Sequence, residues 1–255
     1  FMSELTQQTL LVPLIVFCRV GACFMVLPGF SSDRIPVQLR LFVAIAISLA
    51  IMPIVYDDVR PVAAGPAEGL VSIIVTESLA GLFLGFIVRI FFLALEFAAI
   101  AMANLAGYGS AFSHAIEGND PSTPYSVFVT LPAVVMFFVA DLHIAIIRML
   151  HNSYAALKVG SEFAAPPNLS MIVSTFGSAF KLTLQLSAAL VVYSVMVNLA
   201  FGFLNKMIPQ IPSYFVSTPF VVLGGLIILL QIDSGIISIF SSLVMQAIAT
   251  LGQNG

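Results

Sequence analysis

Residues 70–102 read LVSIIVTESLAGLFLGFIVRIFFLALEFAAIAM, and this apolar run decides the class of the fold. A helix crosses the hydrocarbon core of a bilayer with about 20 mostly apolar residues, so the run exceeds what one upright span needs. The whole chain has this character: 60% of its residues are hydrophobic, 8% are charged, and the mean hydropathy is +1.10. Soluble domains carry about a quarter charged residues. The surface must therefore face lipid or other subunits, and we predict an all-α, membrane-associated protein.

Five further apolar runs lie on either side of this one. They are Leu10–Pro28, Leu41–Tyr56, Val127–Leu150, Met171–Leu204 and Phe215–Leu251. The runs at 70–102, 171–204 and 215–251 are each long enough for a strongly tilted helix or for a broken pair. We therefore expect about six helices, or about eight if the long runs break. The sequence lacks the alternating short segments that are typical of outer-membrane barrels.

Many of the charged residues lie inside or at the ends of these apolar runs. They are Arg19, Glu77, Arg89, Glu96, Asp141, Arg148, Lys181 and Asp233. A charge at the bilayer centre costs about 2.5–3.5 kcal/mol on insertion scales, so several of them do not suit a free-standing, lipid-facing bundle. The Lys and Arg residues of the linkers also give no clear excess on one side of the membrane. Both observations favour a subunit that is held within a larger assembly.

Other features of the composition narrow the possible functions. The net charge is −3 and there is no basic patch, which argues against a nucleic-acid partner. Cys18 and Cys23 lie in one apolar run without the close spacing of a zinc or redox pair, so they are interpreted as core residues. No phosphate loop, dinucleotide fingerprint or metal-ligand spacing is present, and no cofactor is expected. Prolines at the edges of the runs, Pro209 and Pro219 among them, predict kinked or broken helices.

One polar stretch, Asn104 to Ser126, interrupts the apolar pattern in mid-chain. It is rich in glycine and serine, and Gly107 and Gly109 permit backbone conformations that other residues avoid. Asp120-Pro121 is typical of a turn. The stretch is either a solvent loop between two spans or a re-entrant, pore-lining segment, which can be non-helical only inside protein or along a water-filled cavity. Its small and apolar residues suit the second alternative.

Two kinds of chemistry can be considered for the polar residues. Ser110 beside a glycine-rich turn, with His143 or His151, suggests an intramembrane hydrolase, but no oxyanion donor can be identified. Glu96, Asp141 and His143 are candidates for a proton relay, or for the midplane site of a secondary transporter of a small solute. Asp141 and His143 are two residues apart and so do not share a helix face. Structural pairing of buried charges is the more frequent explanation for such residues.

Three blocks of sequence together resemble a known family. The first contains Arg19 and continues as LPGFSSDRIPVQLR at 27–40. The second runs from Glu96 through the loop to Asp120-Pro121, then to FFVADLH at 137–143 and to Ser153-Tyr154. The third is NLAFGFLNKMIPQ at 198–210, followed by FVSTPF at 215–220. Over nearly the whole chain this resembles the FliR family of flagellar export-gate proteins, whose virulence-system relatives are called SctT, and the third block is closer to the flagellar branch.

The resemblance implies an architecture and a set of partners. The chain would be a single export-gate subunit over 1–255, with long, kinked helices arranged as helical hairpins in a helical gate assembly. FliP-like and FliQ-like subunits would share that gate, an FlhB-like protein would associate with it, and flagellar proteins would be exported through it. The gate would lie in the bacterial inner membrane at the flagellar basal body, partly raised towards the periplasm.

The resemblance also implies roles for individual residues. The loop 104–126 would be a plug between two helical halves that closes the pore, with Phe112 as the apolar constriction. The stretch from Ser113 to Asn119 is longer than the family's usual spacing before Asp-Pro. The plug residues would be Asn104, Gly107, Gly109, Phe112, Ser113, Asp120 and Pro121. The buried charges needed for assembly would be Arg19, Glu96, Asp141 and His143. The kinks and the third motif would involve Asn205, Pro209, Gln210 and Pro219.

Taken together, these observations predict a non-enzymatic subunit of the flagellar type III export gate, which forms part of a conduit for unfolded proteins and seals it at rest. The alternatives are the homologous subunit of a virulence injectisome and the solute transporter. Reversal of the charge at Arg19 or Glu96 is expected to impair assembly, since a buried charge needs its partner.

Overall fold

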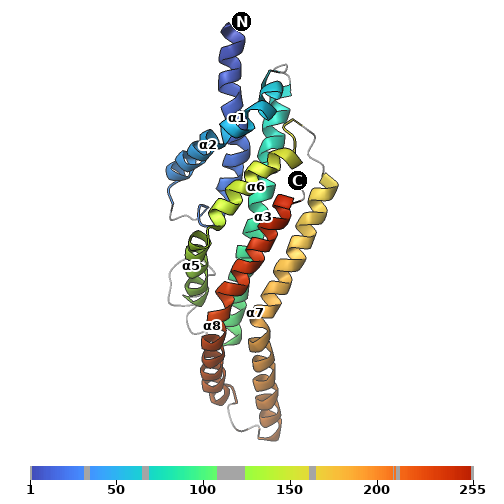
Figure 1. Cartoon of the computed structure of the whole chain (residues 1–255). Coiled ribbons are helices and arrows are strands. Elements are labelled where there is room, and N and C mark those ends of the chain that lie inside the picture. The colour runs from blue at the N-terminus through green and yellow to red at the C-terminus, as the bar shows by residue number, and fades with distance from the viewer. Residues whose placement is uncertain are drawn as a thin grey trace. The chain divides into compact units, whose positions relative to one another are not determined.

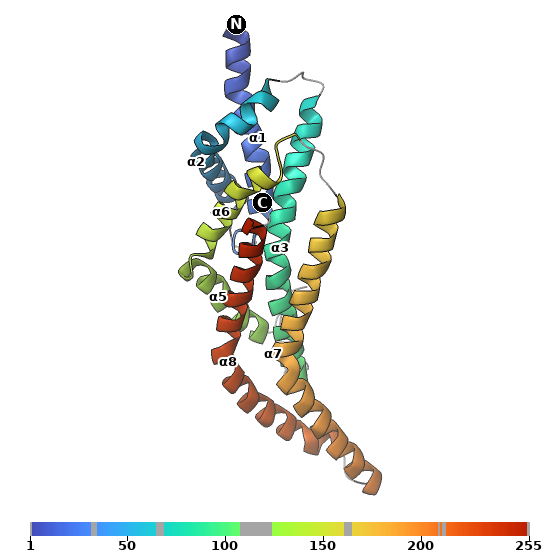
Figure 2. The same ribbon diagram turned by 45° about the vertical axis from the view of Figure 1, so that its right-hand side comes forward.

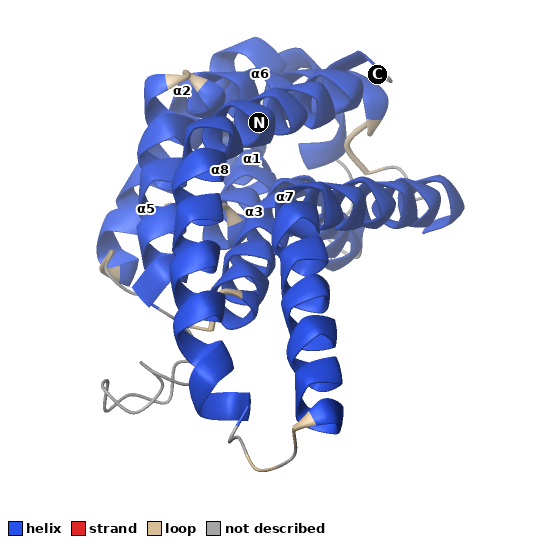
Figure 3. Cartoon of the chain, turned by 90° about the horizontal axis from the view of Figure 1, so that it is seen from below, coloured by secondary structure: helices blue, strands red, loops and turns tan. Residues whose placement is uncertain are grey.

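The computed structural model describes residues 2–31, 35–64, 69–107, 124–160, 165–208, 210 and 213–253. Within these ranges every regular element is a helix and no strand occurs (Figure 3). The helices are α1 (Met2–Val26), α2 (Val37–Ala63), α3 (Leu70–Leu105), α5 (Pro124–Val139), α6 (Leu142–Ala156), α7 (Ala165–Met207) and α8 (Ser213–Gln253) (Figure 1). The predicted all-α class is confirmed.

The long apolar runs stay whole, and a shorter one breaks. α3, α7 and α8 have 36, 43 and 41 residues, each without an interruption. The run at 127–150, in contrast, forms α5 and α6, which meet at an angle of 64°. The break lies at Asp141, the only described non-glycine residue with a positive φ, at 55°. Because aspartate tolerates the left-handed conformation better than most side chains do, this residue can end one helix and start the next.

Among the described residues, fewer helices are long and apolar enough to cross a membrane than the sequence has apolar runs. Val37–Ala63, Leu70–Leu105 and Leu169–Met207 are long and apolar enough, and the bent pair of α5 and α6 makes a fourth candidate in the described part of the chain. The most apolar window of α3 is 61% buried within the protein, whereas those of α2 and α7 are 22% and 17% buried. α3 is therefore a core helix, and α2 and α7 turn large apolar surfaces outward.

The chain divides into two compact units. Unit 1 comprises Phe1–Ile90, Phe138–Phe176 and Leu243–Gly255, and unit 2 comprises Phe91–Phe137 and Gly177–Ser242. In unit 1, α1 packs beside α2, as both side views show (Figures 1 and 2). In unit 2, the paired parts of α7 and α8 are joined by a hydrogen bond of 2.5 Å from the Tyr193 hydroxyl to the carbonyl oxygen of Phe220.

Two glycines of α3 let α1 approach closely within unit 1. A Cβ at Gly81 would overlap the carbonyl oxygen of Arg19, and one at Gly85 would lie 2.7 Å from the carbonyl oxygen of Cys23. The two glycines are four residues apart and so share one helix face, which is the small-residue spacing that allows membrane helices to pack closely. The backbones of α1 and α3 are in contact there.

Replacement of Gly81 by alanine is expected to destabilise the protein by about 1–3 kcal/mol, because the new methyl group has to push α1 away from α3. The measurement is the thermal unfolding midpoint of the purified protein in detergent. Gly177→Ala is the matched control, since nothing lies within 4 Å of the Cβ position at that helical glycine. A Gly81→Ala protein as stable as the control variant would contradict the close packing of α1 on α3.

Candidate functional site

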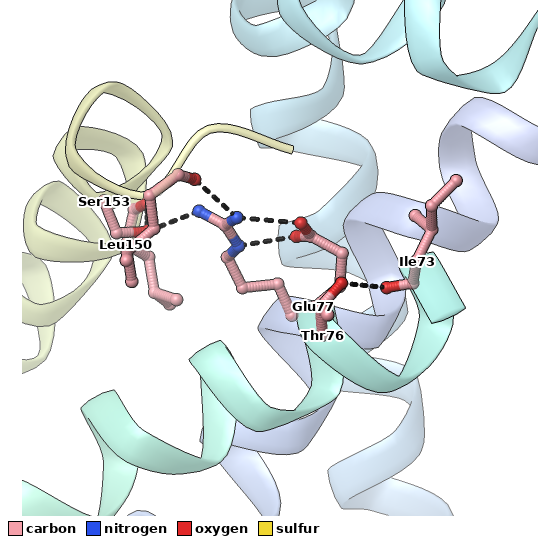
Figure 4. A network of polar contacts seen from close by, with 7 residues as sticks. Ile73, Thr76, Glu77, Leu150 and Ser153 are labelled. Carbon is pink, nitrogen blue, oxygen red and sulfur yellow. Dashed lines mark hydrogen bonds and ion pairs between the residues drawn. The ribbon is translucent and has the colours of Figure 1, made fainter. Parts of the chain in front are cut away.

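The most distinctive polar site is a buried ion pair in unit 1 between α1 and α3. Arg19 of α1 is 1% exposed, and its Nε and Nη2 atoms donate hydrogen bonds of 2.6 Å and 2.9 Å to the two carboxylate oxygens of Glu77 in α3. Glu77 is 2% exposed (Figure 4). This two-point contact is the strongest and most directional geometry of a guanidinium with a carboxylate.

The C-terminal part of α6 supplies the remaining contacts of Arg19. Nη1 donates to Oγ of Ser153 over 3.1 Å, and Nη2 donates to the carbonyl oxygen of Leu157 over 2.8 Å. Cζ of Arg19 lies 4.1 Å from the ring centroid of Tyr154, which is a cation–π distance. Ser153 in turn donates to the carbonyl oxygen of Leu150 (Figure 4). The side chain of Arg19 therefore connects α1, α3 and the end of α6.

This cluster suits a structural role better than a catalytic one. A guanidinium side chain carries hydrogen-bond donors and no acceptor, so it is poorly suited to act as a general base. The partners of Arg19 compensate for its burial, which is the condition under which a charge is tolerated in a low-dielectric interior. Among the described residues there is also no group of His, Cys, Asp and Glu that could hold a metal ion.

A second arginine of α3 supports the end of α1. Nη1 of Arg89 donates to the carbonyl oxygen of Val26, the last residue of α1, over 3.3 Å and to Oγ of Ser31 over 3.0 Å. A cation at a helix C-terminus satisfies a carbonyl group that has no partner inside the helix. The edge-to-face ring contacts of Phe30 with Phe24 and Phe138 bury the adjoining turn.

Of the predicted buried charges other than Arg19, none has a charged partner among the described residues. Glu96 is half-buried on α3 in unit 2 and makes no ion pair there. Asp141 is exposed at the start of α6, so within this chain it is not a buried charge. His143 is half-buried; its Nδ1 atom is buried without a hydrogen-bond partner in the described residues, and its ring lies 5.6 Å from that of Phe138. The proton relay therefore has no connected path among the described residues.

Of the hydrolase candidates, only the two histidines lie among the described residues. His151 is exposed, and its Nδ1 atom lies 3.1 Å from Oδ1 of the neighbouring Asn152. Ser110 lies outside the described residues.

Most of the predicted plug also lies outside the described residues, including Gly109, Phe112, Ser113, Asp120 and Pro121. The helices reach further into the stretch than expected, because α3 includes Asn104 and α5 begins at Pro124. Gly107 has a φ of 82°, and a Cβ there would lie 3.2 Å from methyl carbons of Val221 and Val222 in α8. The positive φ explains why glycine occupies the exit from α3.

The residues that lead into this loop are buried within unit 2. Met102, Ala103 and Ala106 have no exposed surface. A Cβ at Gly225 of α8 would lie 2.7 Å from the Cβ of Ala106, so α8 packs directly on the last turn before the loop.

The residues of the third block lie around the connection between α7 and α8. Asn205 and Gln210 are exposed, Pro209 lies outside the described residues, and Pro219 is inside α8. The Tyr193 hydroxyl approaches α8 next to Pro219, and a Cβ at Gly224 would collide with that hydroxyl. Tyr193 therefore fits against α8 only because residue 224 has no side chain.

Sequence reasoning missed the partners of Arg19. Glu77 was recognisable as an opposite charge in another apolar run, and Ser153-Tyr154 belongs to the second block, but nothing in the pattern joins them to Arg19. The close contact of Ala106 with Gly225 was also missed, because a pair of small residues far apart in the sequence leaves no periodic signal.

Comparison with known proteins places the chain among export proteins. The family described as bacterial export proteins, family 1, matches residues 10–247. The flagellar biosynthetic protein FliR of Caulobacter vibrioides is 29% identical over 90% of this chain and 91% of its own length. The FliR protein of Aquifex aeolicus is 28% identical over 90% of this chain and 88% of its own length. The Yop proteins translocation protein T of Yersinia pestis is 25% identical, with coverages of 85% and 84%.

Proposed function

Because the chain belongs to the bacterial export proteins, family 1, we propose that it is a non-enzymatic membrane subunit of the flagellar type III protein export gate. The observation that carries this proposal is the family match over residues 10–247, which includes each described candidate membrane span. The flagellar FliR proteins of Caulobacter vibrioides and Aquifex aeolicus have higher identities than the translocation protein of Yersinia pestis, which favours the flagellar branch over the injectisome branch.

The outward apolar surfaces support a position within an assembly. α2 and α7 are poorly buried within this chain although both are long and apolar enough to cross a membrane. FliP-like and FliQ-like subunits, with an FlhB-like protein, are the proposed neighbours of these surfaces, and unfolded flagellar proteins are the proposed cargo. The proposed location is the inner membrane at the flagellar basal body, with the gate partly raised towards the periplasm.

The loop 104–126 is the proposed seal of the conduit. Support comes from its start, where Ala106 is buried against Gly225 and Gly107 turns the chain out of α3. Because the residues just before the loop are buried against α8, the loop can move aside while α3 stays folded. Phe112 is the proposed apolar contact that excludes water and ions from the resting pore.

The test of this function is native mass spectrometry of the protein co-expressed with its FliP-like and FliQ-like subunits and extracted in detergent. The expected result is a large complex that contains this chain together with both partners. A stable monomer or homodimer that ignores those partners would contradict the proposal, and a solute transporter would then become the leading interpretation. Restoration of swimming in a strain that lacks its own FliR separates the flagellar from the injectisome branch.

A further inference from the structure

Unit 1 exposes two stripes of large apolar side chains, one on α3 and one at the start of α7. In each stripe the second residue follows the first by four positions and the third follows the second by three, so the three share one helix face. The residues are Val75, Leu79 and Leu82 on α3 and Leu169, Val173 and Phe176 on α7, and all six are exposed in this chain.

The two stripes meet at an aromatic contact. Phe86 follows Leu82 by one helical turn on α3, and its ring lies 6.4 Å from that of Phe176 in an edge-to-face arrangement. The two helices run in the same direction, because the Thr183 hydroxyl, further along α7, donates to the carbonyl oxygen of Ala94, further along α3. The stripes therefore lie next to each other and form one apolar surface, which we call the α3–α7 face.

The whole of α7 does not fit inside a bilayer. It has 43 residues, which corresponds to about 65 Å along the helix axis. A tilt of about 40°, at the upper end of those seen for membrane helices, still leaves about 50 Å along the bilayer normal. The hydrocarbon core is only about 30 Å thick. In any ordinary orientation a large part of α7 therefore lies outside the lipid tails.

The charges of α7 indicate which part lies outside. Lys181 is the only charged residue between Leu169 and Asn205. The uncharged residues 182–205 can cross the membrane by themselves, since about 20 suffice, and they are flanked by Lys181 and Lys206, whose side chains can reach the headgroups. A position with the start of α7 in lipid would bring Lys181 into the hydrocarbon, which is costly. The start of α7 and the part of α3 beside it are therefore beyond the reach of lipid tails.

We propose that the α3–α7 face binds an apolar α-helix of another subunit of the export gate, outside the hydrocarbon core. A contiguous apolar surface that neither lipid nor this chain covers is typical of a protein interface. The matching four-and-three spacing of the two stripes suits a third helix, whose own side chains at that spacing would pack between them. This inference rests on the proposed function, because the partner is a gate subunit.

The test is photo-cross-linking in the complete gate complex. A benzophenone amino acid replaces Val173 of α7 in one complex and Leu79 of α3 in another, and mass spectrometry identifies the adducts after irradiation. Both positions are expected to attach to the same helix of a partner subunit. The control position is Arg60, which is exposed at the C-terminal end of α2 in the same unit and lies outside the α3–α7 face. Loss of the partner adduct is expected there.

Three results would overturn the proposal: adducts of Val173 with lipid, adducts with a second copy of this chain, and partner adducts no more abundant than at Arg60. An intact complex with any of these results refutes the docking face and leaves the export function standing, whereas absence of the complex contradicts both. The subunit content of each complex is measured before irradiation. If the bulky residue displaces one partner at Val173 and Leu79 but not at Arg60, that displacement supports the proposal.

Discussion

Replacement of Glu77 by leucine is expected to lower the free energy of unfolding by about 3–5 kcal/mol, because it leaves the charge of Arg19 buried without its carboxylate. Arg19 is 1% exposed, so its guanidinium has almost no contact with solvent. The neutral oxygens of Ser153 and Leu157 would remain as acceptors, but they carry no charge to offset that of the guanidinium. The measurement is thermal unfolding in detergent, together with the yield of co-purified gate complex.

Two further variants distinguish the contribution of the ion pair to stability from that of side-chain packing. The double change Arg19→Met with Glu77→Leu is expected to recover most of the loss, since an apolar pair of similar volume often matches a buried ion pair in stability. Asp57→Leu is the control for loss of a carboxylate, because Asp57 is exposed on α2 in the same unit. If Glu77→Leu proved no worse than Asp57→Leu, the arginine cluster would not be what connects the three helices.

Deletion of residues 108–118 is expected to make the assembled gate leak ions, on the order of tenfold above the intact complex, because it removes the proposed apolar constriction that would exclude water. The measurement is the ion permeability of vesicles that contain the reconstituted gate. The deletion leaves Ala106 and Gly107 in place, so the packing of α8 on the end of α3 is preserved.

Replacement of residues 108–118 by a glycine and serine loop of the same length tests whether the proposed plug needs its apolar side chains. It keeps the reach of the segment but removes Phe112, so it is expected to leak as the deletion does. Phe128→Ser is the control for loss of a phenylalanine, since Phe128 is 63% exposed on α5. If the deletion complex retained all its subunits and had the same ion permeability as the intact gate, the proposed role of the loop as a plug would be refuted.

The helical class could be predicted from the sequence because it depends on the hydropathy of single runs. α3 and α7 are recognisable as long apolar segments without reference to anything else in the chain. The break at Asp141 was not predicted, because the run around it is continuous in hydropathy and only the backbone conformation at one residue divides it. Pro219 was expected to kink or break a helix, and it lies inside α8 without ending that helix.

The candidate site was predictable only in part. A buried role for Arg19 follows from its place in an apolar run, since an isolated charge there is costly. Its partners are 58 to 138 residues away in the sequence, and no periodic pattern connects such distances. Asp141 is exposed within this chain, because it lies at the break between two helices and not inside one, and its burial in an assembly stays a prediction.

The long sequence separation within the arginine cluster has a consequence for biosynthesis. Chains grow at about 5–20 residues per second, so Arg19 waits about 3–12 s for Glu77 and about 7–27 s for Ser153 to be synthesised. During that interval α1 is an apolar segment with an unneutralised cation, and a charge at the bilayer centre costs about 2.5–3.5 kcal/mol on insertion scales. A chain that stalls before α6 would retain an arginine without its contacts to Ser153 and Leu157, so α1 reaches its full set of partners only late in synthesis.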